Sequence, residues 1–389
     1  MAERVYLDWN ATAPLRAEAR EAMIAALDAI GNPSSVHAEG RAARRLMDDA
    51  RRRVAALVGA EPGDVVFTSG GTEANALALA PGAASRAPQV LLVSAIEHPS
   101  VLAGGRFAAD EIISIPVGPD GVVDLGALEH RLAALERDGR GRALVSLMHA
   151  NNETGVVQPI AAAAAIVHQA GGLLHVDAVQ GAGRIPCDIN DLGADLLTIS
   201  GHKLGGPQGV GALVRRADAL NRVEPLIKGG GQERGARAGT ENVAAIAGFG
   251  AAAEAAARDR DAECQRLGAL RDRLEASLKV DFPDAAIFGA ECERLPNTSL
   301  FAVPGAKAET AVIGLDLGGV AVSSGAACSS GKVAPSHVLA AMGVPAPLAR
   351  GAVRVSIGYA TQETDIDRFL AAWRRLAQTL LKESHGIAA

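Results

Sequence analysis

Short apolar runs alternate with longer amphipathic stretches through about the first 240 residues of the chain. The apolar runs are rich in Val, Ile and Leu and are closed by Gly, Pro or Ser, which is typical of buried strands. They are Val65–Thr68, Val90–Ser94, Ala143–Met148, Leu173–Val176, Leu196–Ile199 and Gly211–Val214. The amphipathic, Ala-rich stretches predict helices at Arg16–Ile30, Arg41–Val58, Thr72–Leu79, Leu125–Glu136 and Ile160–Ala170. This alternation predicts an α/β fold with a mostly parallel sheet that helices cover on both faces.

The pattern changes after about residue 240. An Ala-rich helix, Val243–Ala257, leads into a charged helix, Arg258–Leu278. Shorter strands follow around Thr298–Val303 and Ala352–Ile357, and the last predicted helix is Glu363–Glu383. Because a chain of 389 residues exceeds what one hydrophobic core usually serves, we expect a second, smaller α+β domain after a long helical connector.

The composition argues against several classes of protein. Apolar residues make up 49% and charged residues 21%, so we expect a sizeable core rather than disorder. The net charge of −6 gives no electrostatic reason to expect a nucleic acid or an acidic membrane surface as partner. One basic run has helical spacing and is interpreted as a solvated helix face. It holds Arg41, Arg44, Arg45, Arg51, Arg52 and Arg53.

We find no signal for secretion, for the membrane or for a metal. The opening MAERVYLDWN has no apolar core of a signal peptide, and no stretch reaches the roughly 18 uncharged apolar residues of a membrane helix. The four cysteines lack CxxC spacing, which argues against a structural zinc site and a disulfide framework. We expect a soluble protein of a reducing compartment, in which Cys187, Cys264 and Cys292 are inert buried residues.

The segment TSGGTEAN follows a predicted strand and opens a predicted helix. Gly70 and Gly71 permit a sharp turn, and the free N–H groups of the first helical turn can hold an anion. Thr72 is placed to cap that helix and to donate its hydroxyl group to a phosphate. A plain turn between a strand and a helix is the alternative interpretation.

Two further segments place chemical groups at strand ends. In HVDAVQ, Asp177 is suited to keep a pyridinium nitrogen protonated and Gln180 to bind a ring oxygen, although Asp177 could equally be a capping residue. In SGHKLGGPQGVG, Lys203 is one of only six lysines and stands among glycines, with Ser200 and His202 as phosphate donors. These neighbours are not typical of a solvated surface lysine, and a desolvated lysine has a lowered pKa that suits Schiff-base chemistry. A generic Gly-rich loop is the alternative interpretation.

The order of these segments matters more than any one of them. Pyridoxal 5'-phosphate needs a phosphate cradle, a charge partner for its ring nitrogen and an amine for its aldehyde, and the three segments supply these in turn. Further motifs lie along the whole chain. They are YLDWNATAP, NPSSVHAEGR, EHPSVL, HANNETGVVQP, GGGQERGARAGTEN, SGAACSSGKVAPSHVL and RVSIG.

With these motifs the chain resembles, from end to end, the cysteine desulfurases of the nitrogen-fixation and iron–sulfur-assembly type. These belong to the class V aminotransferase branch of the fold type I pyridoxal-phosphate enzymes. The resemblance implies a large cofactor-binding domain over residues 16–257, with a mostly parallel, seven-stranded sheet between helices. It implies a small domain from residues 1–15 and 258–389 that carries the catalytic cysteine. Trp9 stands where the family often has Asn.

The resemblance also implies roles for individual residues. Lys203 matches the lysine that binds the cofactor, Asp177 the partner of the ring nitrogen and Gln180 the residue that binds the ring hydroxyl group. His98 matches a histidine that stacks on the ring and takes part in proton transfer. The matches to the phosphate-binding residues are Gly71, Thr72, Ser200, His202 and, from a partner subunit, Thr240. The matches to the residues that hold the substrate carboxylate are Asn152, which also belongs to the cofactor site, and Arg354.

Cys328 distinguishes this family from ordinary aminotransferases. It lies in SGAACSSGKVAP, a run of small residues with no apolar anchor, which favours a loop and not a buried packing position. The resemblance implies that Cys328 accepts sulfur from L-cysteine as a persulfide, leaving L-alanine, and passes it to an acceptor such as an iron–sulfur scaffold. It further implies a cytoplasmic homodimer with shared active sites.

A selenocysteine lyase or an aminotransferase on the same fold is the nearest alternative, and the Cys328 segment argues against the aminotransferase. A non-catalytic scaffold predicts decay of the motifs, yet Lys203, Asp177, His98 and Cys328 all stand in intact ones. A nicotinamide dehydrogenase is excluded because no predicted strand is followed by GxGxxG and a later acidic residue. The sequence does not identify the sulfur acceptor.

Overall fold

The computed structural model describes residues 4–80, 88–216, 224–325 and 336–386, with side chains as far as residue 378. Its largest sheet has seven strands in the order β2-β8-β7-β6-β5-β3-β4. Only β8 runs antiparallel to its neighbours, β2 and β7, and the other pairings are parallel. The strands are β2 Val65–Thr68, β3 Pro88–Ser94, β4 Ile112–Ile115, β5 Arg142–Met148, β6 Leu173–Asp177, β7 Leu196–Ser200 and β8 Gly211–Arg215.

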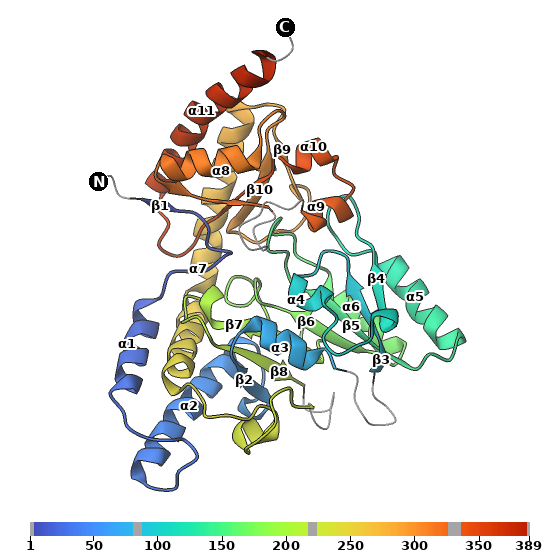
Figure 1. Cartoon of the computed structure of the whole chain (residues 1–389), viewed down its shortest axis with the longest axis vertical. Helices are drawn as coiled ribbons and strands as arrows, with labels where there is room; N and C mark the ends of the chain where they lie inside the picture. Colours follow the sequence, from blue (N-terminus) through green and yellow to red (C-terminus); the bar gives the residue numbers. More distant parts are fainter. Residues whose placement is uncertain (1–3, 81–87, 217–223, 326–335, 387–389) are drawn as a thin grey trace.

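Except along the edge strand β4, both faces of this sheet are buried, which explains why its strands are continuous apolar runs. Alternate residues of β3 and β5 join two different apolar clusters, so that Val145 packs on one face and Leu144 on the other. The first face is covered by α2 (Ala38–Leu57), α5 (Leu125–Arg137), α6 (Ile160–Gln169) and the start of α7. The second is covered by α3 (Gly71–Ala78), which Figure 1 shows in front of the strands.

A second, smaller sheet lies in the upper part of Figure 1. It is antiparallel, in the order β12-β13-β10-β9, and β1 (Val5–Tyr6) pairs separately with β11 (Val320–Ala321). Its strands are β9 Ala286–Ile287, β10 Thr298–Ala302, β12 Ser323–Ser324 and β13 Val353–Ser356. The helices of this part are α8 Ala308–Leu317, α9 His337–Ala341, α10 Ala346–Ala349 and α11 Glu363–Gly386. Phe301, Phe369 and Trp373 form the aromatic centre of its core.

The long helix α7 joins the two sheets, and here the sequence prediction was wrong in one respect. Two helices were expected, but α7 is one helix of 39 residues, Val243–Asp281. Its Ala-rich half packs on the large sheet, whereas Leu267, Leu270, Leu274 and Leu278 of its charged half join the core of the small one. The change in composition therefore marks a change of neighbours along one helix.

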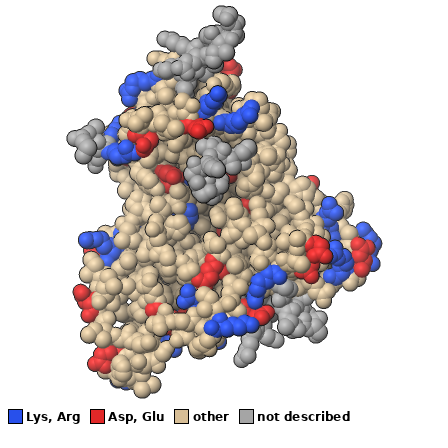
Figure 2. All heavy atoms as spheres, in the orientation of Figure 1, with Lys and Arg blue, Asp and Glu red and all other residues tan. Residues whose placement is uncertain are grey.

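The charged side chains on the visible surface do not mark out a binding face. On the face shown in Figure 2, basic and acidic side chains are interspersed and not gathered by sign. Within the described ranges, no helix is both long enough and apolar enough to cross a membrane. In the same ranges, no cluster of three or more His, Cys, Asp or Glu residues could hold a metal ion.

Candidate active site

A cavity of about 320 Å³ lies where the strands of the large sheet end and the small sheet begins. Parallel strands present their carboxyl ends at the same edge, which is where ligands bind in such sheets. Ten of the residues singled out from the sequence line it. They are Gly71, Thr72, His98, Asn152, Asp177, Gln180, Ser200, His202, Lys203 and Arg354. Residues separated by more than 280 positions in the chain thus meet around one cavity.

The first turn of α3 forms one wall of this cavity. A Cβ atom on Gly71 would lie 3.0 Å from Val179 Cγ2 and 3.4 Å from the Ser200 Cβ, so any larger residue would push the turn away from its neighbours. The structure corrects one expectation here, because Gly70 and not Thr72 is the N-cap of α3. Thr72 lies exposed within the first turn, where its hydroxyl group and the free N–H groups can hold an anion.

Asp177 ends β6 and is buried at the cavity wall. Its carboxylate accepts hydrogen bonds from Asn75 Nδ2 at 2.8 Å and from the Val179 backbone N–H at 3.0 Å. The capping bond to Val179 and the position in the cavity are both present, so the two interpretations of this residue are compatible. Asn75 also donates to Ser100 Oγ, and sequence reasoning missed it although it lies in the TEAN segment of α3.

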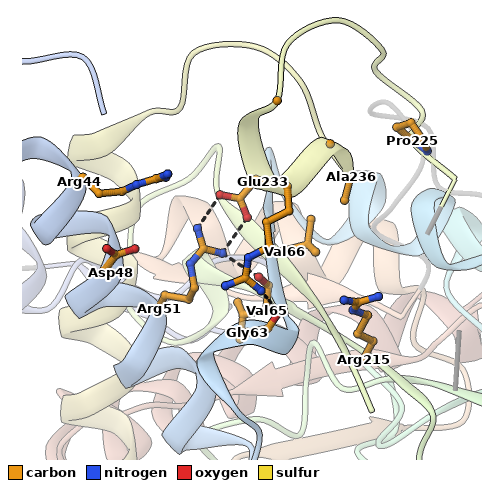
Figure 3. Close-up of a pocket in the computed structure, with 13 residues that line it drawn as sticks. Arg44, Asp48, Arg51, Gly63, Val65, Val66, Arg215, Pro225, Glu233 and Ala236 are labelled. Atoms are coloured by element: carbon orange, nitrogen blue, oxygen red, sulfur yellow. Dashed lines mark hydrogen bonds and ion pairs between the residues drawn. The ribbon is translucent and has the colours of Figure 1, made fainter. Parts of the chain in front are cut away.

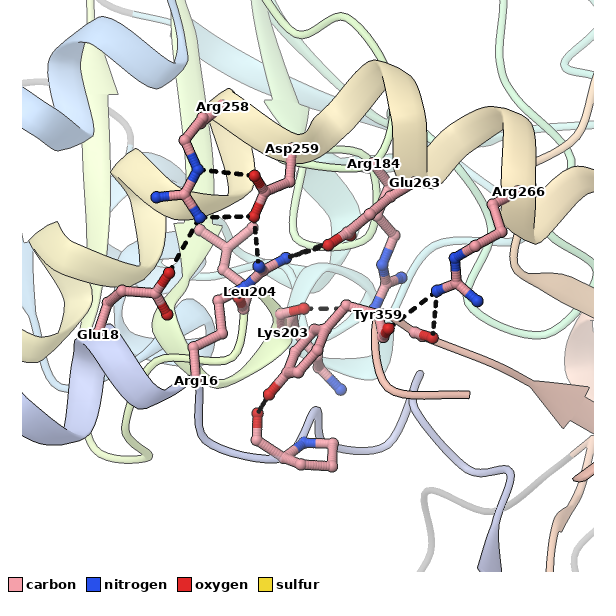
Figure 4. A network of polar contacts seen from close by, with 12 residues as sticks. Arg16, Glu18, Arg184, Lys203, Leu204, Arg258, Asp259, Glu263, Arg266 and Tyr359 are labelled. Atoms are coloured by element: carbon pink, nitrogen blue, oxygen red, sulfur yellow. Dashed lines mark hydrogen bonds and ion pairs between the residues drawn. The ribbon is translucent and has the colours of Figure 1, made fainter. Parts of the chain in front are cut away.

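Lys203 lies in a 3₁₀ turn directly after β7. Its Nζ donates to the Asn10 carbonyl oxygen at 2.5 Å and to that of Ala11 at 2.7 Å. Two arginines hold the backbone behind it (Figure 4): Arg184 Nη2 lies 3.4 Å from the Lys203 carbonyl oxygen, and Arg16 Nε donates to that of Leu204 at 3.1 Å. The lysine therefore rests on a backbone that is fixed from both sides.

The Arg16 side chain owes its position to α7. Its guanidinium group forms ion pairs with Asp259 at 3.2 Å and Glu263 at 3.1 Å and lies 4.3 Å above the centre of the Tyr359 ring. Trp9 packs edge-on against the same ring with 4.9 Å between ring centres. Trp9, which stands where the family often has Asn, is thus a packing residue beside this network and does not line the cavity.

Arg354 reaches the cavity from β13 of the small sheet and is 3% exposed. Its Nη1 donates to the Asn152 carbonyl oxygen at 2.9 Å, and its Nη2 pairs with Asp8 at 2.7 Å. Its Nε is buried and finds no hydrogen-bond partner among the described residues. A guanidinium group at a cavity wall is suited to binding a carboxylate, because its planar fork of N–H donors matches the two carboxylate oxygens.

Two histidines line the cavity as neutral groups. Burial lowers the pKa of His98. The nearby Asp177 carboxylate opposes this shift, whereas the charges of Lys203 and His337 add to it. Because His98 Nδ1 accepts a hydrogen bond from the Ser100 N–H at 3.2 Å, its neutral ring carries the proton on Nε2. Burial also lowers the pKa of His202 to about 4, with Lys203 and Arg184 adding to the effect.

Two predicted site residues are not placed at this cavity by the structure. Thr240 is exposed and is not among the residues that line it. Cys328 lies outside the described residues. Of the other cysteines, Cys187 is buried, and burial raises its pKa to about 12. Cys264 and Cys292 are only half-buried, so the expectation that they are buried was wrong.

A larger cavity of about 670 Å³ lies elsewhere and has different chemistry (Figure 3). Arg51 and Glu233 form a buried ion pair at its wall, with 2.6 Å between Nη2 and Oε1. Arg51 therefore does not belong to the solvated helix face that the sequence predicted. None of the described residues lining this cavity is Ser, Thr, Cys, Lys or His, so it offers no nucleophile and no general base of those types.

The smaller cavity has the donor set that pyridoxal phosphate requires. It combines an amine, a strand-end carboxylate and a helix N-terminus with hydroxyl groups. Asn75 Oδ1, beside Asp177, is buried without a hydrogen-bond partner among the described residues. These groups fit a phosphorylated, protonated pyridine aldehyde.

Comparisons with known proteins agree with this chemistry. The aminotransferase class-V family model matches residues 5–369. The cysteine desulfurase of Cereibacter sphaeroides is 46% identical over 375 residues, which cover 95% of this chain and 94% of that protein. Cysteine desulfurase IscS of Dictyoglomus turgidum is 42% identical, over 98% and 96% of the two chains. The solved NifS-like protein from Rickettsia africae superposes with a TM-score of 0.87 at 37% identity, covering 97% of this chain and 100% of that one.

Proposed function

The chain belongs to the class V aminotransferase family, and from its similarity to the cysteine desulfurases of that family we infer that it is a pyridoxal-phosphate-dependent cysteine desulfurase. It converts L-cysteine to L-alanine and transfers the sulfur to an acceptor. The observation that carries the assignment of roles is that Lys203, Asp177, His98 and Arg354 all line one cavity.

The bound cofactor supplies an electron sink that weakens the bonds at the substrate α-carbon. Lys203 would hold the cofactor and, once its amine is free, would move the proton of the α-carbon. Asp177 would keep the ring nitrogen protonated, since its carboxylate is buried and oriented by Asn75 and Val179. Gln180 would bind the ring hydroxyl group. Each of these groups already lines the cavity.

The phosphate and the substrate carboxylate would bind different residues of the cavity wall. The first turn of α3, with Gly71 and Thr72, would hold the phosphate together with Ser200 and His202. The substrate carboxylate would bind Arg354 and Asn152, which both line the cavity.

The sulfur step assigns roles to His98 and Cys328. His98, neutral near pH 7, would exchange a proton with the substrate thiol. The Cys328 thiolate would attack the substrate sulfur; a new S–S bond forms, the C–S bond breaks, and its electron pair remains with the substrate carbon until protonation gives alanine. The product on the protein is a Cys328 persulfide.

The proposal extends to the setting of the enzyme. It includes a homodimer in which Thr240 reaches the partner's phosphate site; the exposed position of Thr240 is compatible with that role. The sulfur acceptor would be an iron–sulfur scaffold or another sulfur-carrying protein. The enzyme would be located in the cytoplasm. We also propose the division into residues 16–257 and residues 1–15 with 258–389, which the two apolar cores on α7 support.

The test is the release of alanine from L-cysteine in the presence of a reductant, with the wild type compared with Cys328→Ser. Alanine from the wild type and little from the variant is the expected result. Alanine from both would favour the selenocysteine lyase, in which Cys328 is dispensable. Alanine from neither, with purified sulfur acceptor added, would contradict the desulfurase.

A further inference from the structure

Asn10 lies against the candidate active site, yet no step described above uses it. It follows β1 in the N-terminal segment, is 1% exposed and lines the cavity. A fully buried asparagine must have its donors and acceptors satisfied, because an unpaired polar group in the interior costs about 1–3 kcal/mol.

The side chain of Asn10 belongs to a closed ring of hydrogen bonds. Its Nδ2 donates to Thr298 Oγ1 at 2.9 Å, Thr298 Oγ1 donates to Asn297 Oδ1 at 2.9 Å, and Asn297 Nδ2 donates to Asn10 Oδ1 at 3.1 Å. Exchanging the two ends of the Asn10 amide would bring donor against donor at Asn297. The ring therefore permits one orientation of this side chain.

Three more bonds tie Asn10 to both sheets. Its Nδ2 donates to the Asn152 carbonyl oxygen at 3.2 Å, and Arg184 Nη1 donates to Asn10 Oδ1 at 3.1 Å. Its backbone N–H donates to Ser356 Oγ at 3.0 Å. The peptide group of Asn10 is thereby fixed relative to the loops after β5 and β6 and to strands β10 and β13.

The carbonyl oxygen of this fixed residue points to the catalytic groups. It accepts hydrogen bonds from Lys203 Nζ at 2.5 Å and from Gln180 Nε2 at 3.1 Å. The carbonyl oxygen of the next residue, Ala11, accepts a second hydrogen bond from Lys203 Nζ at 2.7 Å. A neutral carbonyl oxygen can orient an amine but cannot take its proton. A carboxylate in the same place would hold the lysine as an ammonium ion and oppose its use as a proton carrier.

We propose that Asn10 is a positioning residue for Lys203: its side-chain ring fixes the carbonyl oxygen on which the lysine amine rests whenever it is not bonded to the cofactor. The inference rests on the proposed function, because only a reaction that releases the lysine amine and then uses it needs such a resting place. Holding the amine within the cavity keeps it within reach of the substrate α-carbon during each turnover.

The test uses three variants of the full-length protein. Asn10→Ala removes the whole side chain, and Thr298→Val removes only the hydroxyl group that closes the ring. Thr298→Ser keeps that hydroxyl group and is the matched control. In cofactor-free protein, limited acetylation with acetic anhydride, read by peptide mass spectrometry, gives the labelling of Lys203 relative to Lys279. Lys279 is a suitable reference because its Nζ also donates to a backbone carbonyl, that of Ala285, and neither residue is among the described hydrogen-bond partners of Asn10.

We expect the Lys203-to-Lys279 labelling ratio to rise several-fold in Asn10→Ala and Thr298→Val and to return to the wild-type ratio in Thr298→Ser. With cofactor bound, kcat for alanine release should fall by roughly ten- to a hundredfold in the first two variants while KM for L-cysteine changes little. Should Asn10→Ala fail to fold, Thr298→Val, which nearly conserves volume, decides the question.

Two results would overturn the inference. One is an unchanged labelling ratio in folded Asn10→Ala or Thr298→Val, even if the melting temperature falls, because a merely structural role predicts that outcome. The other is an unchanged kcat in both variants. A wild-type protein that releases no alanine from L-cysteine would instead refute the proposed function, and the labelling ratio would still report whether Asn10 holds the lysine.

Discussion

Replacing Arg354 by lysine should weaken the binding of L-cysteine and leave the chemical step largely intact. The guanidinium group is 3% exposed and uses Nη1 for the Asn152 carbonyl and Nη2 for Asp8. Its Nε has no hydrogen-bond partner among the described residues. A lysine offers a single ammonium group on a flexible stem, which cannot satisfy Asp8, Asn152 and a substrate carboxylate in the same planar arrangement.

The size of the effect follows from the bonds that are lost. One hydrogen bond between charged groups contributes about 1.5–3 kcal/mol. Since about 1.4 kcal/mol corresponds to tenfold in affinity, the loss of one such bond to the substrate carboxylate raises KM roughly ten- to a hundredfold. The proton-transfer groups, Lys203 and His98, make no hydrogen bond to Arg354 in the described structure, so kcat should change much less.

The assay is the initial rate of alanine release over a range of L-cysteine concentrations, with a reductant to clear the persulfide. Arg273→Lys is the matched control. Arg273 of α7 forms exposed ion pairs with Glu363 and Asp367 of α11. Because exposed ion pairs contribute little to stability, a lysine can replace Arg273 with little loss of folding free energy. An unchanged KM in Arg354→Lys, or an equal rise in both variants, would refute the assignment of Arg354 to the substrate carboxylate.

Three further predictions concern covalent attachment and stability. Lys203→Ala should leave no cofactor trapped on the protein by borohydride and no alanine release; turnover at the wild-type rate would contradict its role. Glu233→Gln should lower the free energy of unfolding, measured by urea titration, by about 3–5 kcal/mol, because it leaves the buried Arg51 guanidinium without its counter-ion. A loss below about 1 kcal/mol, which is typical of exposed ion pairs, would contradict the stabilising role of this buried pair. Burial raises the pKa of Glu153 from 4.5 to about 7, so the stability that its neutral form provides is complete below pH 4.5 and is lost as the pH rises through 7. Glu153→Gln should therefore abolish a fall in melting temperature that the wild type shows between these values, and parallel curves for the two proteins would exclude Glu153 as its source.

The strands of the large sheet could be predicted well because helices cover both of its faces. β2 has the predicted bounds, and the other five predicted strands differ from the structure by one or two residues at an end. β4 was missed because it is an edge strand whose first three residues are half-buried or exposed, which leaves no continuous apolar signal. The two-residue strands of the small part, such as β1 and β11, owe their existence to a distant pairing partner and have no local pattern.

The fold class and the family could be predicted for a different reason. Residues that meet at the carboxyl edge of a parallel sheet come from loops directly after strands, so Asp177 and Lys203 follow recognisable apolar runs. The match to the class V aminotransferases confirms the family resemblance. The roles of the individual site residues, Thr240 and Cys328 among them, stay predictions.

Asn10 shows what sequence reasoning could not reach, and why. Its hydrogen-bond partners lie 142, 288 and 346 positions away along the chain, so no periodicity or spacing near residue 10 reports on them. An asparagine between Trp9 and Ala11 is typical of a solvated turn, yet this one is buried at the junction of two sheets. A cavity that must stay open to a polar ligand cannot be held together there by apolar packing alone. Around Asn10 its walls are joined by hydrogen bonds that form only in the folded protein, and a closed ring of such bonds specifies one arrangement. The position of Lys203 is therefore set by residues whose importance appears only once both sheets are in place.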